Sequence, residues 1–395
     1  MNLVKFYQPE YYKNFRCTGS ECRNNCCHHW SIDIDKATYD KYMAFNEDIK
    51  QEFIDKLTPQ KNPDAGALAK VDSEGNCMFL NSKGLCTIQL RFGHDYLSKT
   101  CKIYPRIFNL IDNSPERFLE LSCEAAAKDI LLDKNFMNFY EVEEDLNTHE
   151  SGGINIHSTL KPEKYTKTEN SINIFWKLRV TTIAILQSRK YTVRFRMMIL
   201  CIFMQDVSDY LSSGRDNTVI NLSEVYLNRI ESNYYKDLFA SMPNGVDREF
   251  GVMLDILKEM YLRRNALFMK SVNFALGGFD IDPDKWILPD DMNEMFTRIY
   301  EMYFADKEYI FENYLVHRVL SEGFPFNYKG EGNVLNNYVD LMTKYNIVEF
   351  LFTGICRSCM KYDKRHIIDC ISAFTRAYDH SFTKFLKTEE FFSNI

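Results

Sequence analysis

Eight of the twelve cysteines lie in the first third of the chain, and this clustering constrains the fold more than any other feature of the sequence. They are Cys17, Cys22, Cys26, Cys27, Cys77, Cys86, Cys101 and Cys123. The N-terminus shows no apolar segment or cleavage site of a signal peptide, so we expect a cytoplasmic protein. In a reducing compartment, clustered cysteines are more often metal ligands than disulfides. We therefore interpret this region as a metal site.

The spacing of the thiols favours an iron–sulfur cluster over zinc. The first group reads Cys-x4-Cys-x3-Cys-Cys, and the second is separated by gaps of 8, 14 and 21 residues. Zinc ribbons use short Cys-x2-4-Cys pairs in both halves, which the second group lacks, whereas a cluster tolerates long gaps. We expect a [4Fe-4S] cluster, with zinc as the alternative metal. Four of the thiols exceed its need and could form a second metal site, a redox pair or buried apolar contacts.

Other side chains near the cysteines are candidates for binding or catalysis. His28 and His29 could add a non-thiolate ligand, although histidines in loops more often bond to the backbone. His94 is a candidate base. Tyr104 and Arg106, shortly after Cys101, could orient a ring and a guanidinium toward a bound carboxylate, or could simply form a turn.

The residue patterns predict a mainly α fold with two domains. Residues 1–140 are expected to form an irregular, cysteine-rich metal-binding domain with short hairpins, including a hairpin-like knuckle at 77–88. A polar linker at 141–170 should lead to an all-α domain at 171–395 that binds substrate or partner. No alternation long enough for a central sheet is evident. Helices are predicted at 35–53, 124–132, 171–189, 192–211, 222–239, 247–268, 290–303, 306–320, 334–352 and 364–386.

Several function classes are disfavoured. The net charge of −7 and the absence of a basic run argue against nucleic-acid binding. The longest apolar run, Met197–Met204, is too short to span a bilayer. No glycine-rich G-x-G-x-x-G motif follows a strand, so a Rossmann-type nucleotide site is not supported. The C-terminal pair Cys356 and Cys359 falls in a predicted helix, where buried structural cysteines are expected.

The chain resembles the bacterial flagellin lysine-N-methylase family. The resemblance is carried by four cysteine segments and three helical ones: residues 15–27, 77–86, 100–106, 121–123, 175–179, 185–191 and 312–316. The cysteine part also resembles a wider set of bacterial domains described as zinc- or iron-chelating. The resemblance implies methyl transfer from S-adenosylmethionine to surface lysines of flagellin in the cytoplasm, with a four-iron cluster. The radical pattern Cys-x3-Cys-x2-Cys would place cysteine at position 29, where this chain has His29.

Two hypotheses follow from the sequence. In the first, the protein is a methyltransferase whose helical domain holds flagellin. In the second, it is a metal-stapled binding module that captures flagellin or another helical partner and catalyses nothing, because aromatic-rich helical surfaces suit the capture of a helix in a groove.

Overall fold

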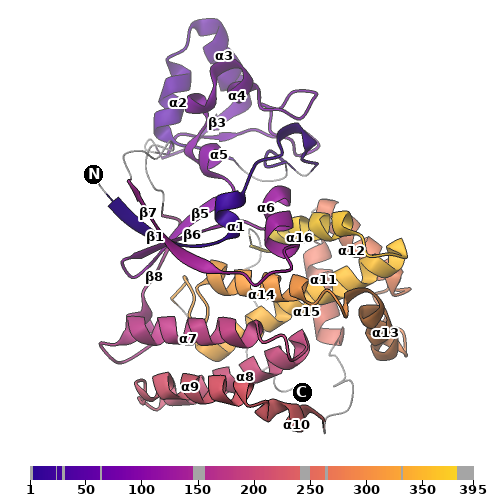
Figure 1. The fold of residues 1–395 in the computed structure, drawn as a ribbon. Helices are drawn as coiled ribbons and strands as arrows, with labels where there is room; N and C mark the ends of the chain where they lie inside the picture. The colour runs from indigo at the N-terminus through magenta and orange to yellow at the C-terminus, as the bar shows by residue number, and fades with distance from the viewer. Residues whose placement is uncertain are drawn as a thin grey trace.

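The computed structural model describes residues 3–23, 25–28, 32–62, 65–145, 156–240, 250–262, 266–330 and 332–379. In these residues a mixed α/β part is followed, from Ser171 onward, by helices (Figure 1). The helical second half confirms the prediction, whereas the N-terminal part is a correction, because it contains two sheets rather than irregular structure. None of the described helices is long and apolar enough to cross a membrane.

The larger sheet has five strands in the order β7-β1-β6-β5-β8. Its strands are β1 (Leu3–Pro9), β5 (Arg106–Ile111), β6 (Ser114–Leu119), β7 (Phe139–Asp145) and β8 (Ser158–Leu160). The hairpin β5–β6 pairs Arg106 with Leu119, and β1 joins β6 in parallel through Tyr7 and Glu116. Two of these strands, β7 and β8, lie largely within the range expected to be a linker; the domain boundaries themselves stay a prediction.

The missed sheet has a physical explanation in its buried polar residues. Glu116 and Arg117 on β6 and Asn109 on β5 are all buried. Arg117 is satisfied by Gln8 and by Glu144 of β7, and its guanidinium stacks on the ring of Phe6. Because the inward positions carry charged and amide side chains, the strands lack the alternation of apolar and polar residues that marks a half-buried strand.

A smaller unit spans residues 32–97 and has its own apolar core. It contains β2 (Asp33–Ile34), α2 (Lys36–Met43), α3 (Glu47–Lys56), β3 (Leu57–Pro59), β4 (Ala67–Ala69), α4 (Thr87–Phe92) and the 3-10 turn η2 (His94–Tyr96). The single helix expected at 35–53 is two helices, because the Asn46 side chain caps the second. Asp35 is the N-cap of α2, since its carboxylate accepts the Thr38 N–H.

Short elements connect these units. They are α1 (Tyr11–Asn14), η1 (Gly19–Glu21), α5 (Lys99–Ile103), α6 (Glu124–Leu131) and η4 (Pro162–Lys164). The helix predicted at 124–132 is thereby confirmed.

The helical part runs from α7 to α16. Its helices are α7 (Ser171–Leu186), α8 (Val193–Ser212), α9 (Thr218–Glu231), α10 (Tyr234–Ala240), α11 (Phe250–Leu262), α12 (Ala266–Gly278), α13 (Met292–Phe304), α14 (Tyr309–Glu322), α15 (Val334–Cys359) and α16 (Lys364–Asp379). The single helices predicted at 222–239 and at 247–268 are each replaced by parts of two helices, α9 and α10 in the first range and α11 and α12 in the second. The expected end of the last helix, 380–386, lies outside the described residues.

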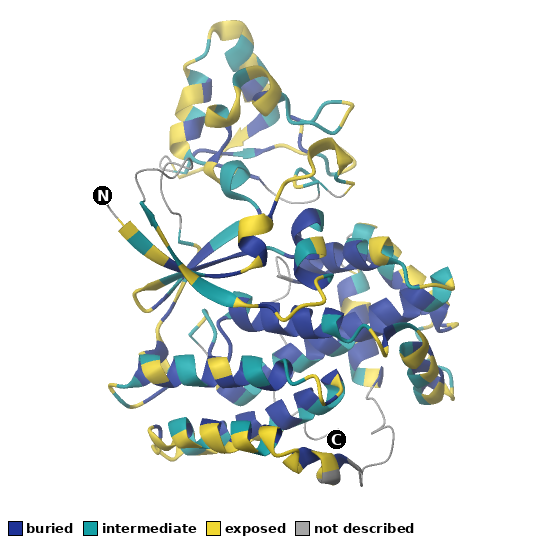
Figure 2. Cartoon of the chain, viewed as in Figure 1, coloured by how far each residue is buried: buried dark blue, intermediate teal, exposed yellow. Residues whose placement is uncertain are grey.

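Helices α14 and α15 form the buried centre, because most of their residues are buried and are drawn in dark blue in Figure 2. At Gly354, α15 meets α12 so closely that an added Cβ would overlap the carbonyl oxygen of Ala275. Gly278 is the last residue of α12 and makes the reciprocal contact with Gly354. The absence of side chains therefore permits the two backbones to pack directly.

Buried ion pairs join the sheet to the helices. Arg179 of α7 lies 2.7 Å from the Glu116 carboxylate of β6, and both side chains are almost fully buried. The same guanidinium donates to the carbonyls of Val319 and Leu320 at the end of α14. One charged pair thus ties three elements that are distant in sequence.

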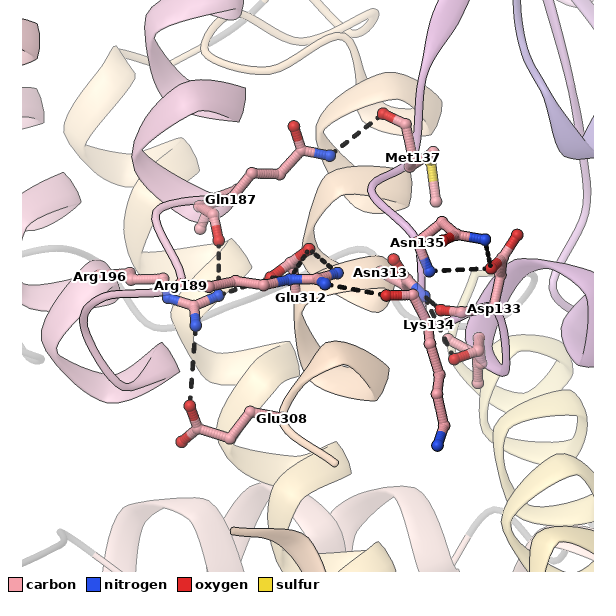
Figure 3. Close-up of polar contacts among 12 residues, drawn as sticks. Asp133, Lys134, Asn135, Met137, Gln187, Arg189, Arg196, Glu308, Glu312 and Asn313 are labelled. Atoms are coloured by element: carbon pink, nitrogen blue, oxygen red, sulfur yellow. Dashed lines mark hydrogen bonds and ion pairs between the residues drawn. The ribbon is translucent and has the colours of Figure 1, made fainter. Parts of the chain in front are cut away.

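A second buried carboxylate, Glu312 of α14, organises the contacts in Figure 3. Arg189 binds both of its oxygens, and Arg196 of α8 donates to one of them at 2.7 Å. Arg189 also donates to the Lys134 carbonyl, and the neighbouring Asn313 donates to the Asp133 carbonyl, so the loop after α6 is held against α14. The network connects the chain that follows the cysteine region to the helical core.

Candidate metal centre

The fold brings together cysteines from segments that are far apart in sequence. Cys17, Cys22, Cys26 and Cys27 lie in the loop after α1, whereas Cys77 and Cys86 flank a tight turn. Cys101 lies in α5, and Cys123 occupies the N-cap position of α6. None of the eight forms a disulfide. Ligation of a metal by them stays a prediction.

Four thiols gather at the base of the small unit, which we call the inner set: Cys27, Cys77, Cys86 and Cys101. All four pack in its apolar cluster. The Cys77 N–H donates to the Cys27 carbonyl at 2.8 Å, which joins the first cysteine loop to the second. A bridge between Leu80 and Cys86 closes the turn between them, so the expected hairpin-like knuckle is present. The inner set therefore combines sulfurs from three chain segments.

The pKa values reflect this proximity. Burial, followed by the charges at Cys26, Cys86 and Cys77, raises the pKa of the Cys101 thiol to about 12. Burial likewise raises the pKa of Cys77 to about 11, with a further contribution from Cys86. Several thiolates crowded in an apolar environment repel one another. A bound cation would remove that cost and release the protons.

The other four thiols, Cys17, Cys22, Cys26 and Cys123, form what we call the outer set. Cys17 and Cys26 are exposed. Burial raises the pKa of Cys123 to about 11, opposed by the Ala126 and Ala125 N–H groups of α6 and reinforced by Cys26 and Cys17. The helix N-terminus therefore favours the thiolate, but burial outweighs it.

Cys26 lies between the two sets. A hydrogen bond with Cys27 lowers the pKa of Cys26 and raises that of Cys27. The charge of Arg376 also lowers the pKa of Cys26. Cys26 is therefore more easily deprotonated than an ordinary thiol before any metal binds.

Helix α16 closes over the outer set, a feature that the sequence did not reveal. The buried Arg376 donates to the Ser122 carbonyl at 2.9 Å and to the Asn25 carbonyl at 3.4 Å. Asp369, about two turns earlier on the same face of α16, pairs with Arg23 at 2.8 Å. Nothing in the local pattern of residues 364–379 indicates that this helix contacts a loop more than 340 positions earlier.

Glu124 is a second residue that the sequence analysis missed. Its carboxylate accepts the Arg23 N–H at 3.1 Å and lies 3.7 Å from the Cys22 sulfur. Burial, followed by this carboxylate, raises the pKa of Cys22 to about 12. An acidic residue immediately after Cys123, in the first turn of a helix, is the signal that could have drawn attention to it.

The candidate side chains Tyr104, Arg106 and His94 differ in whether the structure shows them close to the thiols. Tyr104 is near the thiols: its hydroxyl lies 3.0 Å from Ser122 Oγ, and burial raises its pKa, with Cys123 and Cys26 contributing. Arg106 lies over the Phe15 ring, 5.3 Å from its centre. His94 is exposed in η2. Only Tyr104 of these three is thus shown beside the sulfurs.

The two histidines of the first loop differ in what the structure describes. His28 is half-buried, and its backbone forms a bridge with Asn76. His29 lies outside the described residues.

Comparison with known proteins identifies related sequences. A family model described as the FliB lysine N-methylase C-terminal domain matches residues 179–394. Proteins named lysine-N-methylase from Salmonella choleraesuis and Salmonella typhimurium are each 32% identical over 145 residues, which cover 36% of this chain and 36% of the relative. The flagellar biosynthetic protein FliU of Salmonella muenchen is 32% identical over 141 residues, covering 35% of this chain and 83% of the relative. No solved structure matches.

The match therefore spans about a third of the length of the curated lysine-N-methylases. The family model covers the helical part and begins after the last of the eight clustered cysteines.

Proposed function

We propose, from the premise that the chain belongs to the FliB lysine N-methylase family, that it is a protein-lysine N-methyltransferase using S-adenosylmethionine. The match of the family model over residues 179–394 is the observation that carries this proposal. Because one relative is named a flagellar biosynthetic protein, we propose surface lysines of flagellin as the substrate and the cytoplasm as the place of reaction.

We also propose that the inner set, Cys27, Cys77, Cys86 and Cys101, holds a [4Fe-4S] cluster. Four thiols from a buried apolar cluster are the donors that such a cluster requires. Bound by all four thiolates, the cluster would supply a rigid crosslink; with one of the four thiols unbound, it would instead offer an open iron for the amino and carboxylate groups of S-adenosylmethionine. The outer set, with two exposed thiols, is the proposed second metal site.

Tyr104, Arg106 and His94 have distinct proposed roles. A lysine must lose its proton before it can attack a methyl group, because its ordinary pKa is about 10.4. Tyr104 is not the base that removes the lysine proton at neutral pH, because burial raises the pKa of Tyr104 and its phenol therefore keeps its own proton. We propose that Tyr104 donates a hydrogen bond at the edge of the site, that Arg106 contributes positive charge, and that the exposed His94 accepts the proton.

The proposal is tested with the full chain purified without oxygen. Iron and sulfide are measured, and flagellin is incubated with protein and S-adenosylmethionine while its lysines are followed by mass spectrometry. Cys101→Ser should lose iron, sulfide and methylation, and Cys201→Ser, on α8 outside both sets, should retain all three. Methylation that survives in Cys101→Ser would contradict the need for the cluster.

Other outcomes separate the alternatives. A colourless protein that contains zinc and binds flagellin without adding mass would favour the non-catalytic binding module. A brown protein with iron and sulfide that leaves every flagellin lysine unmodified would refute the proposed reaction but not the proposed cofactor. His94→Gln tests the base, with His157→Gln as the matched control; equal methylation rates in the two variants would exclude His94.

A further inference from the structure

A second cluster of metal-ligating side chains lies at the junction of α15 and α16, far along the chain from the cysteine region. Cys359 is the last residue of α15, and Met360 then takes a left-handed conformation that reverses the chain. Asp363 precedes the first residue of α16, and His366 lies in the first turn of that helix. The turn between the two helices thus presents a thiol, a carboxylate and an imidazole together.

Two of the three distances among these groups match those in a tetrahedral zinc site. Cys359 Sγ lies 3.6 Å from His366 Nδ1, and His366 Nδ1 lies 3.4 Å from Asp363 Oδ1. With ordinary zinc bond lengths and tetrahedral angles, the sulfur–nitrogen edge is about 3.6 Å and the nitrogen–oxygen edge about 3.4 Å. All three ligand atoms lie within 4.8 Å of one another. The ligands therefore need little movement to surround one ion.

Surrounding contacts hold two of the ligands in place. Asp363 Oδ1 accepts the backbone N–H groups of Arg365 and His366, at 2.9 and 3.2 Å, which fixes the carboxylate and still leaves it able to donate to a cation. The His366 ring stacks on Phe274 of α12, with ring centres 5.1 Å apart and planes inclined by 7°. Contacts of this kind orient metal ligands and set their affinity.

The site is also accessible to an ion. The Asp363 and His366 side chains retain 17% and 40% of their exposure, so a metal can enter from solvent. Lys361 lies 3.4 Å from the other Asp363 oxygen, but its side chain is mostly exposed and can turn away. It is a weak competitor for the carboxylate, because exposed ion pairs contribute little.

We propose that Cys359, Asp363 and His366 bind one Zn²⁺ ion, with water in the fourth position. A mixed sulfur, nitrogen and oxygen donor set suits zinc and disfavours Mg²⁺ and Ca²⁺, which take oxygen ligands. The ion fixes the angle between α15 and α16. Since α16 carries Asp369 and Arg376 to the cysteine loop, this zinc site would hold the N-terminal end of the helix that makes those contacts.

The proposal is tested in the full chain by asking whether zinc protects the Cys359 thiol from alkylation. Because each cysteine is followed in its own peptide, the eight clustered cysteines do not interfere with the measurement. The metal-free protein is alkylated with and without added Zn²⁺, and modification of Cys359 and Cys201 is followed by peptide mass spectrometry. Zinc should slow modification of Cys359 roughly tenfold or more, because a metal-bound thiolate is a poor nucleophile. Cys201, on α8, is the control and should react at the same rate with and without zinc.

Variants then assign the ligands. His366→Gln should abolish the protection of Cys359, and Asp363→Asn should weaken it while preserving the helix cap, since asparagine caps as well as aspartate. Cys359→His should retain one more zinc equivalent than Cys359→Ala, because histidine restores a ligand. Equal alkylation of Cys359 with and without zinc in the folded wild-type protein would overturn the proposal, as would full protection in His366→Gln.

Discussion

Replacing Arg179 by methionine should destabilise this protein strongly, because it removes one partner of a buried ion pair. The Glu116 carboxylate would stay fully buried with Tyr328 as a hydrogen-bond partner but without its cation. The carbonyls of Val319 and Leu320 would also lose their donor. Loss of one member of such a pair costs about 3–5 kcal/mol, or roughly a hundredfold to several thousandfold in the unfolding equilibrium.

Helix α7 supplies a matched control two residues away. Lys177 pairs with Glu224 at 3.3 Å, but both side chains are substantially exposed. Lys177→Met removes the same kind of charge and should cost no more than about 1 kcal/mol. Urea unfolding, followed by fluorescence and circular dichroism, gives the free energies of unfolding for the two variants. Similar shifts in the two would refute the reasoning that burial, rather than charge pairing as such, sets the cost.

A double variant separates the charge from its surroundings. Glu116→Gln combined with Arg179→Met leaves no buried charge at this position. It should recover part of the loss seen in Arg179→Met alone, because the main penalty there is an unpaired buried carboxylate.

Further predictions concern packing, capping and the cysteine loop. Gly354→Ala should lower the midpoint of thermal unfolding markedly, because its Cβ would overlap the Ala275 carbonyl oxygen, whereas Gly251→Ala on α11 meets no atom within 4 Å and should stabilise by about 0.5–1 kcal/mol. Asp35→Ala should cost about 1 kcal/mol in the free energy of unfolding by removing an N-cap, and Asp35→Asn much less. Burial raises the pKa of Asp35, but the N–H groups of Lys99 and Thr38 lower it more, so the folded-state pKa lies below the ordinary value. The Asp35 charge therefore stabilises the fold above the ordinary pKa, and this contribution is lost as the pH falls through the folded-state pKa. Unfolding free energies of wild type and Asp35→Asn, compared between neutral and acid pH, measure the contribution. Arg376→Met should slow alkylation of Cys26 at neutral pH in metal-free protein, because the guanidinium lowers the pKa of that thiol; an unchanged rate, mapped by mass spectrometry, would show that Arg376 does not act on Cys26.

The helices of the second half could be predicted because their signals are local. Apolar residues at helical spacing mark α7 and α8, and Asn333 and Thr192 provide capping side chains at the starts of α15 and α8. Errors arose where a helix is interrupted within an apolar pattern. Asn233, in a left-handed conformation, separates α9 from α10 without a glycine or proline to announce it.

The thiols were located by the sequence but not grouped by it. Their number and spacing predicted a metal site, and the fold brings all four chain segments together. Which sulfurs share an environment depends on how the small unit folds: Cys27, Cys77, Cys86 and Cys101 pack in one apolar cluster although they come from three chain segments. Spacing cannot specify that grouping, because it does not determine how distant segments pack.

By itself, then, the sequence determined the helical second half, the capped helix starts and the presence of clustered thiols, since each depends on neighbours a few residues apart. The tertiary structure decided the five-stranded sheet, the closure of α16 over the cysteine loop and the proximity of Cys359, Asp363 and His366. The sheet was hidden because its inward side chains include Glu116 and Arg117, which are tolerated there only because Arg179 and Glu144, from distant segments, neutralise them. A buried ion pair leaves no periodic pattern in either of its two segments, because each charged side chain is tolerated there only through a partner that is distant in sequence.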